Sequence, residues 1–260
     1  MDNILIDLGF IKIYWYSFMI LSGIVFGYIY SMREIKRIGI NKNDFENMIF
    51  YTIIIGLLGA RLYYVLFNLD YYLNNPSEIL MIWHGGLAIH GGIIAGLLVI
   101  YFYCKKRKMN LYKVLDVCVP FLLFGQICGR WGNFFNQEAY GGVVTLEYLK
   151  GLRLPEFIIN GMYINGSYHH PTFLYESISN LIVLISILII RKKNIRESVI
   201  LGLYLAFYGI IRFFIEGLRT DSLMFFNLRI AQIVSLLFFI CGIVVLILSK
   251  KKGYYNKVEK

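Results

Sequence analysis

A run of fourteen residues near the middle of the chain carries side chains that could do chemistry, and it begins where an apolar segment ends. The run, residues 129–142, reads GRWGNFFNQEAYGG and holds one arginine, two asparagines, one glutamine, one glutamate and four glycines. Polar groups at membrane depth are costly unless they have partners or a function, and glycine lets the backbone approach a ligand closely. We interpret the run as a binding or catalytic site; the alternative is a structural helix end followed by a solvated loop.

A second set of polar residues lies in an apolar segment near the C-terminus. Tyr208, Arg212 and Glu216 are spaced by four residues, which places them on one face of a helix, and Arg219 follows three residues later. An Arg212–Glu216 pair that only neutralises itself is the structural alternative. Together with Arg130, however, three arginines with one nearby acid leave an excess of positive charge. Guanidinium groups bind phosphate oxygens bidentately, so we expect an anionic phospholipid or a phosphorylated lipid carrier as ligand.

Two histidines are candidate proton acceptors by residue type. His84 and His90 flank the glycine pair 85–86, and a second pair follows at 91–92. Histidine is the side chain whose ordinary pKa suits proton transfer near neutral pH. A structural role at a glycine-rich helix start is the alternative, and it suits His84 better than His90, which lies deeper in its apolar segment.

The composition indicates what kind of molecule must position these residues. Of 260 residues, 58% are hydrophobic and only 16% are charged, and the mean hydropathy is +0.62. A soluble domain is closer to half apolar and a quarter charged, so we predict a multi-spanning membrane protein. The net charge of +10 does not indicate nucleic acid, because the lysines cluster in short runs between apolar segments. The four cysteines form no metal-ligand pattern, and no cleavable signal peptide is visible.

Seven apolar segments have the length and composition of membrane spans. They are residues 14–32, 48–67, 85–104, 114–129, 171–190, 198–218 and 228–249. The predicted fold is an all-α membrane protein, a bundle of seven transmembrane helices in a single integral membrane domain, 1–260. Residues 133–171 are predicted to form a small head insertion, with short strands between 157 and 168. A small-residue pair, Gly56 and Ala60, predicts close helix packing in the second span.

The charge pattern also predicts how the spans are oriented. Most of the 26 Lys and Arg residues follow the first, third, fifth and seventh spans. By the positive-inside rule the N-terminus is outside, the C-terminus is cytoplasmic and the head is extracytoplasmic. This orientation places most of the unusual polar residues near the outer ends of spans, with Arg61 deeper and Asp116 nearer the inner end. We therefore expect a shared cavity that opens to the outer leaflet.

At these residues the sequence resembles a known family. The motifs are G129-R-x-G-N-F-x-N-x-E-x-x-G141, W15-Y16, G59-A-R-L-Y-Y64, H90-G-G92, Asp116 with Pro120, H170-P-T-F-L-Y-E176 and Y208-G-x-x-R-x-x-x-E-x-x-R219. In this order and spacing they resemble the bacterial phosphatidylglycerol–prolipoprotein diacylglyceryl transferases over nearly the whole chain. Ala60 stands where a second glycine is common, and residues 142–169 follow no fixed pattern.

The resemblance implies an activity. Such an enzyme transfers the diacylglyceryl group of phosphatidylglycerol to the lipobox cysteine of a preprolipoprotein signal peptide, without metal or cofactor. It acts at the outer face of the plasma membrane of a bacterium, forms a thioether and releases glycerol phosphate. None of the chain's own cysteines is then a nucleophile, because the substrate supplies the thiol.

The resemblance also implies roles for individual residues. Arg130 and Arg212 would bind the phosphate and stabilise its charge, and His90 would be the base, with Tyr208 as the second candidate. Asn133 and Glu138 would orient Arg130 or the headgroup, Glu216 would hold Arg212, and Tyr16 would line the access route. The expected substrate-binding set is Tyr16, Arg61, Asn133, Glu138, Gly141, His170, Glu216 and Arg219.

Two functions of other classes remain open on the sequence alone. A transporter of lipids or lipid-linked precursors would also need a cationic cavity, but its polar residues should continue to the inner face. A seven-helix signalling receptor would need a pocket but no clustered arginines. Transfer of mass to a lipobox peptide distinguishes the enzyme from both.

Overall fold

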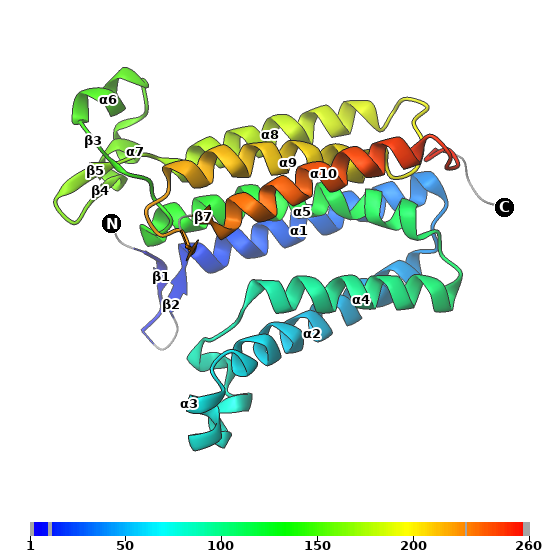
Figure 1. The fold of residues 1–260 in the computed structure, drawn as a ribbon, viewed down its shortest axis with the longest axis horizontal. Coiled ribbons are helices and arrows are strands. Elements are labelled where there is room, and N and C mark those ends of the chain that lie inside the picture. Colours follow the sequence, from blue (N-terminus) through cyan, green and yellow to red (C-terminus); the bar gives the residue numbers. More distant parts are fainter. Residues whose placement is uncertain (1–2, 10–11, 227, 257–260) are drawn as a thin grey trace. The chain divides into compact units, whose positions relative to one another are not determined.

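The structure is a computed structural model that describes residues 3–9, 12–226 and 228–256. Within these residues the chain is mostly helical, and seven helices are long and apolar enough to cross a membrane (Figure 1). They are α1 (Trp15–Ile38), α2 (Lys42–Leu66), α4 (Ile89–Arg107), α5 (Leu111–Asn136), α8 (Thr172–Ile190), α9 (Val199–Leu218) and α10 (Ile230–Ser249). The predicted all-α membrane class and the count of seven are confirmed.

Short elements connect these helices. They are β1 (Ile4–Asp7), β2 (Lys12–Tyr14), α3 (Leu69–Asn74), the 3-10 helices η1 (Pro76–Leu80) and η2 (Ile82–His84), β3 (Val143–Val144), α6 (Leu146–Gly151), α7 (Glu156–Gly161), β4 (Tyr163–Ile164), β5 (Ser167–His169), β6 (Met224–Phe225) and β7 (Leu228–Arg229). The strands form the antiparallel pairs β1–β2 and β6–β7 and a three-stranded sheet of order β3-β5-β4. The strands expected between residues 157 and 168 are present as β4 and β5.

Several helix ends differ from the predicted ones. Helix α5 continues to Asn136, so the first half of the 129–142 run is helical, where hydropathy alone had ended the span at 129. Gly132 allows α5 to approach α1 closely, because a Cβ atom at this position would lie 2.8 Å from the Tyr16 ring of α1. Helix α4 begins at Ile89 because Gly85 and Gly86 have φ angles of +86° and +72°, which lie outside the helical region.

The described chain divides into two compact units, residues 39–114 and residues 1–38 with 115–260, and each is considered by itself. In the 39–114 unit, α2 packs on α4 through small residues. A Cβ atom on Gly59 would lie 2.4 Å from the Cβ of Ala95, and one on Gly91 would lie 2.3 Å from the Gly59 carbonyl oxygen. Gly56 and Ala60 both approach Gly92, which confirms the close packing that the small-residue pair predicted.

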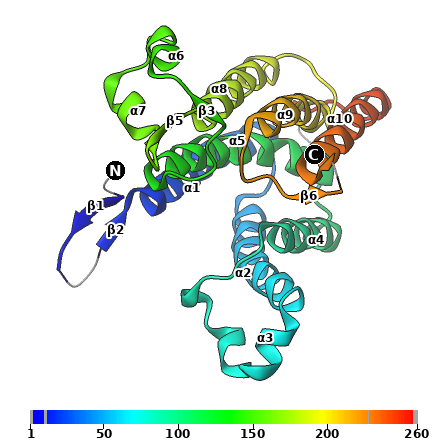
Figure 2. The same ribbon diagram turned by 60° about the vertical axis from the view of Figure 1, so that its left-hand side comes forward.

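The larger unit contains α1, α5, α8, α9 and α10. Helix α10 lies along α9 (Figure 2), and a Cβ atom on Gly209 of α9 would be 2.6 Å from the Ser235 carbonyl oxygen of α10. Helix α1 packs on α5 in the same way, since a Cβ atom on Gly23 would be 3.0 Å from the Cα of Gly125. Glycines therefore bring the helices of this unit close together.

The segment between α5 and α8 folds around a small apolar core. Phe134 at the end of α5 stacks on Phe173 at the start of α8, with ring centroids 4.5 Å apart. Buried residues of the segment itself complete the cluster: Leu149, Ile158, Ile159, Met162 and Ile164. The segment is thus anchored to the two helices that flank it.

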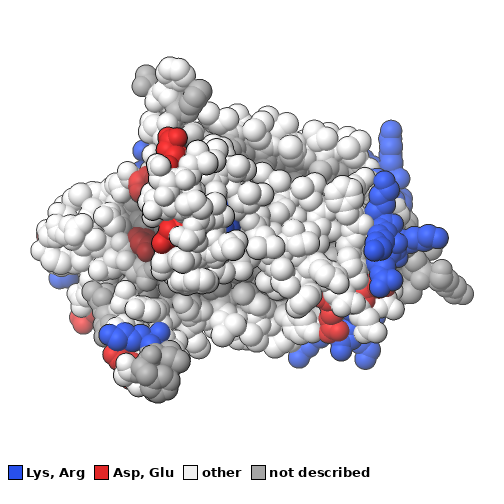
Figure 3. Space-filling model, turned by 90° about the horizontal axis from the view of Figure 1, so that it is seen from below, with Lys and Arg blue, Asp and Glu red and all other residues white. Residues whose placement is uncertain are grey.

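The end of the larger unit that lies away from the segment between α5 and α8 is rich in Lys and Arg (Figure 3). Here Glu34 of α1 is only 2% exposed. It is paired with Arg37 at 2.5 Å and with Arg191, and it accepts a hydrogen bond of 2.7 Å from the hydroxyl of the fully buried Tyr255. Nearby, the carboxylate of Asp116 accepts hydrogen bonds from the backbone N–H groups of Ser198 and Leu201 and so caps the N-terminus of α9.

Candidate active site

A buried carboxylate joins two arginines from different helices. Glu176 of α8 is 1% exposed. Its Oε2 accepts a hydrogen bond of 3.0 Å from Nη1 of Arg212 on α9, and its Oε1 lies 3.1 Å from Nε of Arg130 on α5. The contact with Arg130 is an ion pair by distance but does not have hydrogen-bond geometry, since both of its atoms lack a hydrogen-bond partner among the described residues. Three helices therefore meet at one carboxylate.

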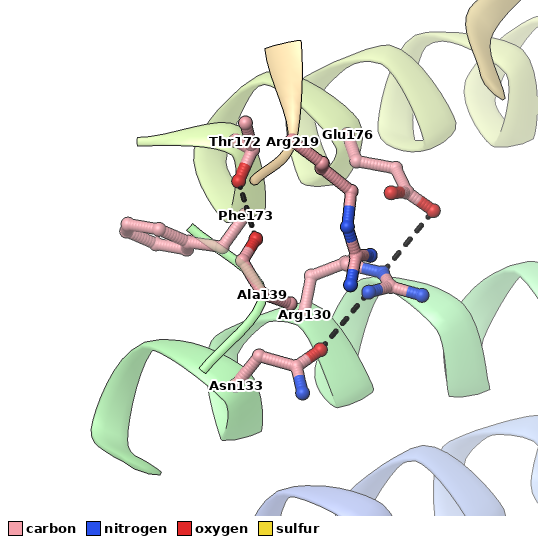
Figure 4. A pocket seen from close by; sticks show the side chains of 7 residues that line it. All are labelled: Arg130, Asn133, Ala139, Thr172, Phe173, Glu176 and Arg219. Carbon is pink, nitrogen blue, oxygen red and sulfur yellow. Dashed lines mark hydrogen bonds and ion pairs between the residues drawn. The ribbon is translucent and has the colours of Figure 1, made fainter. Parts of the chain in front are cut away.

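Each of the two arginines has a further partner on its own helix. Nη1 of Arg130 donates a hydrogen bond of 3.0 Å to Oδ1 of Asn133 (Figure 4). Nη2 of Arg212 lies 2.6 Å from Oε2 of Glu216, four residues along α9. Asn133 and Glu216 thus contact the arginines that they were expected to orient and to hold, and their roles in the reaction stay predictions.

A third arginine reaches the same place from the residue after α9. Arg219 lines a narrow pocket together with Arg130, Asn133, Ala139, Thr172, Phe173 and Glu176. The side chains of Arg130, Glu176 and Arg219 converge there (Figure 4). Arg219 also donates two hydrogen bonds, of 2.9 and 2.6 Å, to Asp221. These bonds hold the pKa of the Asp221 carboxyl below its ordinary value.

The sequence count of one nearby acid was incomplete. Glu176 and Asp221 accompany Glu216 as partners of Arg130, Arg212 and Arg219, and the guanidinium of Arg229 also reaches Glu216, at its backbone carbonyl. The spacing argument counted only the acid on the same helix face as Arg212, and Glu176 comes from another helix. The arginines are thus held in place by carboxylates before any ligand is present.

The backbone at Gly141 connects the inserted segment to the end of α9. Its N–H donates to the carbonyl of His170, and the N–H of Gly142 donates to the carbonyl of Leu218. A Cβ atom on Gly141 would lie 2.6 Å from the Cβ of His170 and 3.0 Å from the Leu218 carbonyl oxygen. The carbonyl oxygen of Gly141 also contacts Nδ1 of His169 at 2.9 Å. Only glycine fits this junction.

Two other predicted residues lie near this junction and make different contacts. Glu138 accepts a hydrogen bond of 3.0 Å from Asn136 and is exposed, so in this structure it does not hold Arg130. His170 lies 3.4 Å from the hydroxyl of Tyr175 through Nδ1, and its ring meets that of Tyr148 at 5.0 Å. Burial lowers the pKa of His170 below its ordinary value of 6.5.

The two predicted tyrosines belong to helices of the same unit. Tyr16 of α1 lies against Gly132, two residues after Arg130 on α5. Tyr208 of α9 precedes Arg212 by one turn and stacks on Tyr204 with ring centroids 5.6 Å apart.

Arg61 and His90 belong to the 39–114 unit and are described within it. Arg61 is 5% exposed and donates to the backbone carbonyls of Ile79, Gly85, Gly86 and Glu78 at 2.5–2.9 Å. Its guanidinium therefore holds the 76–86 loop onto α2. His90 is exposed, in the first turn of α4, with its ring 6.2 Å from that of Tyr63. His84 pairs instead with Glu78 at 2.9 Å. Roles for Arg61 and His90 in the reaction stay predictions.

Glu176 is the residue that the sequence reasoning did not assign to the site. The available signal was an acid inside an otherwise apolar span, since α8 carries no other charged residue. An acid at that depth needs a partner, and Arg130 and Arg212 were the candidates.

Chemically, the cluster is suited to an oxyanion. Two guanidinium groups from different helices present several N–H donors to one small region, in a partly buried setting where charge interactions are stronger than in water. An anion that enters competes with Glu176 and Asn133 for the donors that they now occupy, or uses the remaining N–H groups of the two arginines.

Comparison with known proteins gives a consistent answer. The family described as "Prolipoprotein diacylglyceryl transferase" matches residues 3–248. A relative from Halalkalibacterium halodurans is 47% identical over 254 residues, which cover 97% of this chain and 88% of the relative. Relatives from Bacillus cereus and Bacillus mycoides are 45% and 46% identical over 257 residues, or 99% of this chain and 95% of each relative. All three are named phosphatidylglycerol–prolipoprotein diacylglyceryl transferase. The chain therefore belongs to the prolipoprotein diacylglyceryl transferase family.

Proposed function

We propose that Arg130 and Arg212 bind the phosphate of phosphatidylglycerol while its diacylglyceryl group is transferred to a prolipoprotein. The reaction is that of the family, and the relatives support it for this chain because they match it over almost its full length. The observation that carries the site assignment is the junction of α5, α8 and α9 at Glu176, where Arg130 and Arg212 lie 3.1 and 3.0 Å from the same carboxylate. The protein is a multi-pass membrane transferase that acts in lipoprotein modification.

The chemistry needs positive charge at this place. The thiol of the lipobox cysteine in the preprolipoprotein signal peptide attacks the glyceryl carbon that bears the phosphate. A carbon–sulfur bond forms, the carbon–oxygen bond to the phosphate breaks, and glycerol phosphate leaves with the bonding electrons. The thiol must first lose its proton, since the thiolate is the nucleophile. Negative charge then grows on the leaving phosphate, and fixed guanidinium groups lower the barrier.

The carboxylates give the site a defined starting state. Glu176 and Glu216 hold Arg212, and Glu176 and Asn133 hold Arg130, so the donors are positioned before lipid binds. A phosphate that binds both arginines competes with Glu176 for their donors. Because Glu176 stays in the buried cluster, binding adds one negative charge to it.

The proton acceptor is proposed to be His90, with Tyr208 as the alternative. His90 is exposed at the start of its helix, as a group that meets a substrate should be. Tyr208 lies one turn from Arg212, which suits it better to lining the site. The proposed substrate-binding residues also include Tyr16, Gly141, His170 and Arg219.

The orientation in the membrane is also proposed. The Lys- and Arg-rich end of the larger unit would be cytoplasmic, which places the N-terminus, the 133–171 head and the arginine cluster on the outer side of the plasma membrane. The cluster lies four residues from the start of α8 and six from the ends of α5 and α9. It would then face the outer leaflet, from which the lipid enters.

The transporter alternative would need polar residues that continue toward the inner face. Asp116 is one of the two candidates on that side, and its carboxylate is occupied in capping α9.

The test is transfer of mass. Purified protein is reconstituted with phosphatidylglycerol and incubated with a lipobox peptide, which should gain the mass of one diacylglyceryl group per cysteine. A peptide with serine in place of the cysteine should gain nothing. Unchanged peptide mass with well-folded protein would contradict the function, and transfer that persists in the Arg212→Leu variant would contradict the site.

A further inference from the structure

Below the arginine cluster, one helical turn deeper along the same three helix faces, lies a second layer of polar side chains. Gln126 precedes Arg130 by four residues on α5, Asn180 follows Glu176 by four on α8, and Tyr208 precedes Arg212 by four on α9. Residues four apart on a helix lie above one another. Helices α5 and α9 run from the Lys- and Arg-rich end toward the cluster, whereas α8 runs from the cluster toward that end. Gln126, Asn180 and Tyr208 therefore lie on the same side of the cluster. Tyr204 lies one further turn along α9.

Contacts between the helices support this placement. The hydroxyl of Ser177 on α8 contacts the carbonyl oxygen of Ile127 on α5 at 3.5 Å, between the two layers. Nε2 of Gln126 donates a hydrogen bond of 2.8 Å to the hydroxyl of Tyr204. Tyr204 stacks on Tyr208, with the ring planes 19° apart. These contacts join Gln126 of α5 to Tyr204 and Tyr208 of α9, and they join α8 to α5 at Ser177, three residues before Asn180.

Asn180 is the unusual member of this layer. It is 0% exposed, and within the described part of the chain neither its Nδ2 nor its Oδ1 has a hydrogen-bond partner. Oε1 of Gln126 is likewise unpartnered among the described residues. A buried amide without partners is costly, and such groups in native proteins usually have a ligand or a task. Leucine would fill this space in an apolar bundle without that cost.

We propose that Asn180, with the hydroxyl of Tyr204, forms a subsite for an ester carbonyl of the phospholipid's diacylglyceryl group. This inference rests on the proposed function, since it assumes that the phosphate binds at Arg130 and Arg212. The ester groups of a phospholipid lie a few bonds from the phosphate on its membrane side. An ester carbonyl is only an acceptor, and the subsite offers it donors: the Nδ2 hydrogens of Asn180 and the hydroxyl hydrogen of Tyr204, whose oxygen already accepts from Gln126.

The subsite gives the enzyme a way to place the reacting carbon. The phosphate held by the arginines and an ester carbonyl held one turn deeper would fix the two ends of the glyceryl unit. The carbon that the thiol attacks lies between them. A lipid that lacks the ester carbonyls would keep the phosphate contacts and lose the second point of attachment.

The test compares two lipids that differ only in these carbonyls: diester phosphatidylglycerol and its diether analogue with matched alkyl chains. With wild-type protein in nanodiscs, KM for the diether lipid should be about fivefold higher, the ratio expected for one hydrogen bond to a neutral acceptor. The Asn180→Leu variant should raise KM for the diester lipid and lower the ratio between the two lipids, because only the Tyr204 hydroxyl then remains as a donor. Ser249→Ala is the control, because its buried hydroxyl donates to the Leu246 carbonyl within α10, at the end of that helix far from β7. This variant should keep the wild-type ratio.

The possible failures are distinguishable. Equal KM values for the two lipids with wild-type protein would overturn the subsite and leave the function intact, and this comparison does not depend on whether a variant folds. A variant that still prefers the diester lipid as strongly as wild type would also overturn it. Absence of transfer from the diester lipid with wild-type protein would contradict the proposed function itself.

Discussion

The substitution Arg130→Lys separates the geometry of the guanidinium from its charge. Arg130 uses two different nitrogens at once: Nε lies 3.1 Å from Oε1 of Glu176 on α8, and Nη1 donates at 3.0 Å to Oδ1 of Asn133 on α5. A lysine carries one nitrogen and cannot occupy both positions. It therefore keeps the charge but loses either the contact between helices or the contact within α5.

The expected loss follows from the role of the lost donor. In the proposed reaction the donors of Arg130 act on charge that develops as the phosphate leaves. Removal of one such donor typically lowers kcat by about 10²–10³, or about 3–4 kcal/mol. Because lysine retains the charge, we expect the lower end of this range, an about 10²-fold loss in kcat/KM. The stability cost should be small, since Glu176 keeps Arg212.

The assay is the initial rate of mass gain by a lipobox peptide with phosphatidylglycerol nanodiscs, at equal amounts of folded protein. Arg33→Lys is the matched control, because Arg33 is exposed on α1 at the Lys- and Arg-rich end; it should transfer at the wild-type rate. Near-normal transfer by Arg130→Lys would refute the reasoning, because it would show that a point charge is sufficient at this position.

Three further outcomes are expected. His90→Ala should slow transfer by about 10²-fold or more, as loss of a general base does, while lipid binding measured by native mass spectrometry persists; lost lipid binding would place His90 in the pocket instead of the chemistry. Gly141→Ala should destabilise the protein by about 1–3 kcal/mol in thermal unfolding, because its Cβ would clash with two backbone-anchored neighbours. Gly142→Ala, with open space around its Cβ, should not, and equal melting points would contradict the junction. Since burial lowers the pKa of His170 from 6.5, the unfolded state binds the proton more readily, and stability should fall as pH drops through about 6.5; His170→Gln should flatten this slope, and an unchanged slope would exclude His170 as its origin.

Much of the fold could be predicted because the bilayer imposes simple rules. A span must be apolar and long enough to cross, and seven segments met this requirement in the sequence and in the structure. Hydropathy alone could not place the helix ends. The polar run after Gly129 continues α5 for seven more residues, since a helix can extend beyond the hydrocarbon as long as its side chains find partners.

The site was only partly predictable for a related reason. Spacing along one helix identified Arg212 and Glu216 as a pair, and the 2.6 Å contact agrees. Residues that meet across two helices have no fixed spacing in the sequence. The position of Glu176 between Arg130 and Arg212 could therefore not be predicted from any one span. Arg61 is a further case, because its contacts with the backbone carbonyls of Ile79, Gly85 and Gly86 follow no spacing rule in the sequence. Its expected part in substrate binding stays a prediction.

The network around Glu34 has a consequence for how the protein is made. Glu34 lies on α1, whereas Arg191 follows it by 157 residues and Tyr255 by 221. Glu34 and Arg37, three residues apart, are made almost together, but the other two partners become available only after α8 and α10 have been synthesised. The helices of the larger unit can therefore enter the membrane one by one, and this network joins them only when the segment after α10 folds back onto α1.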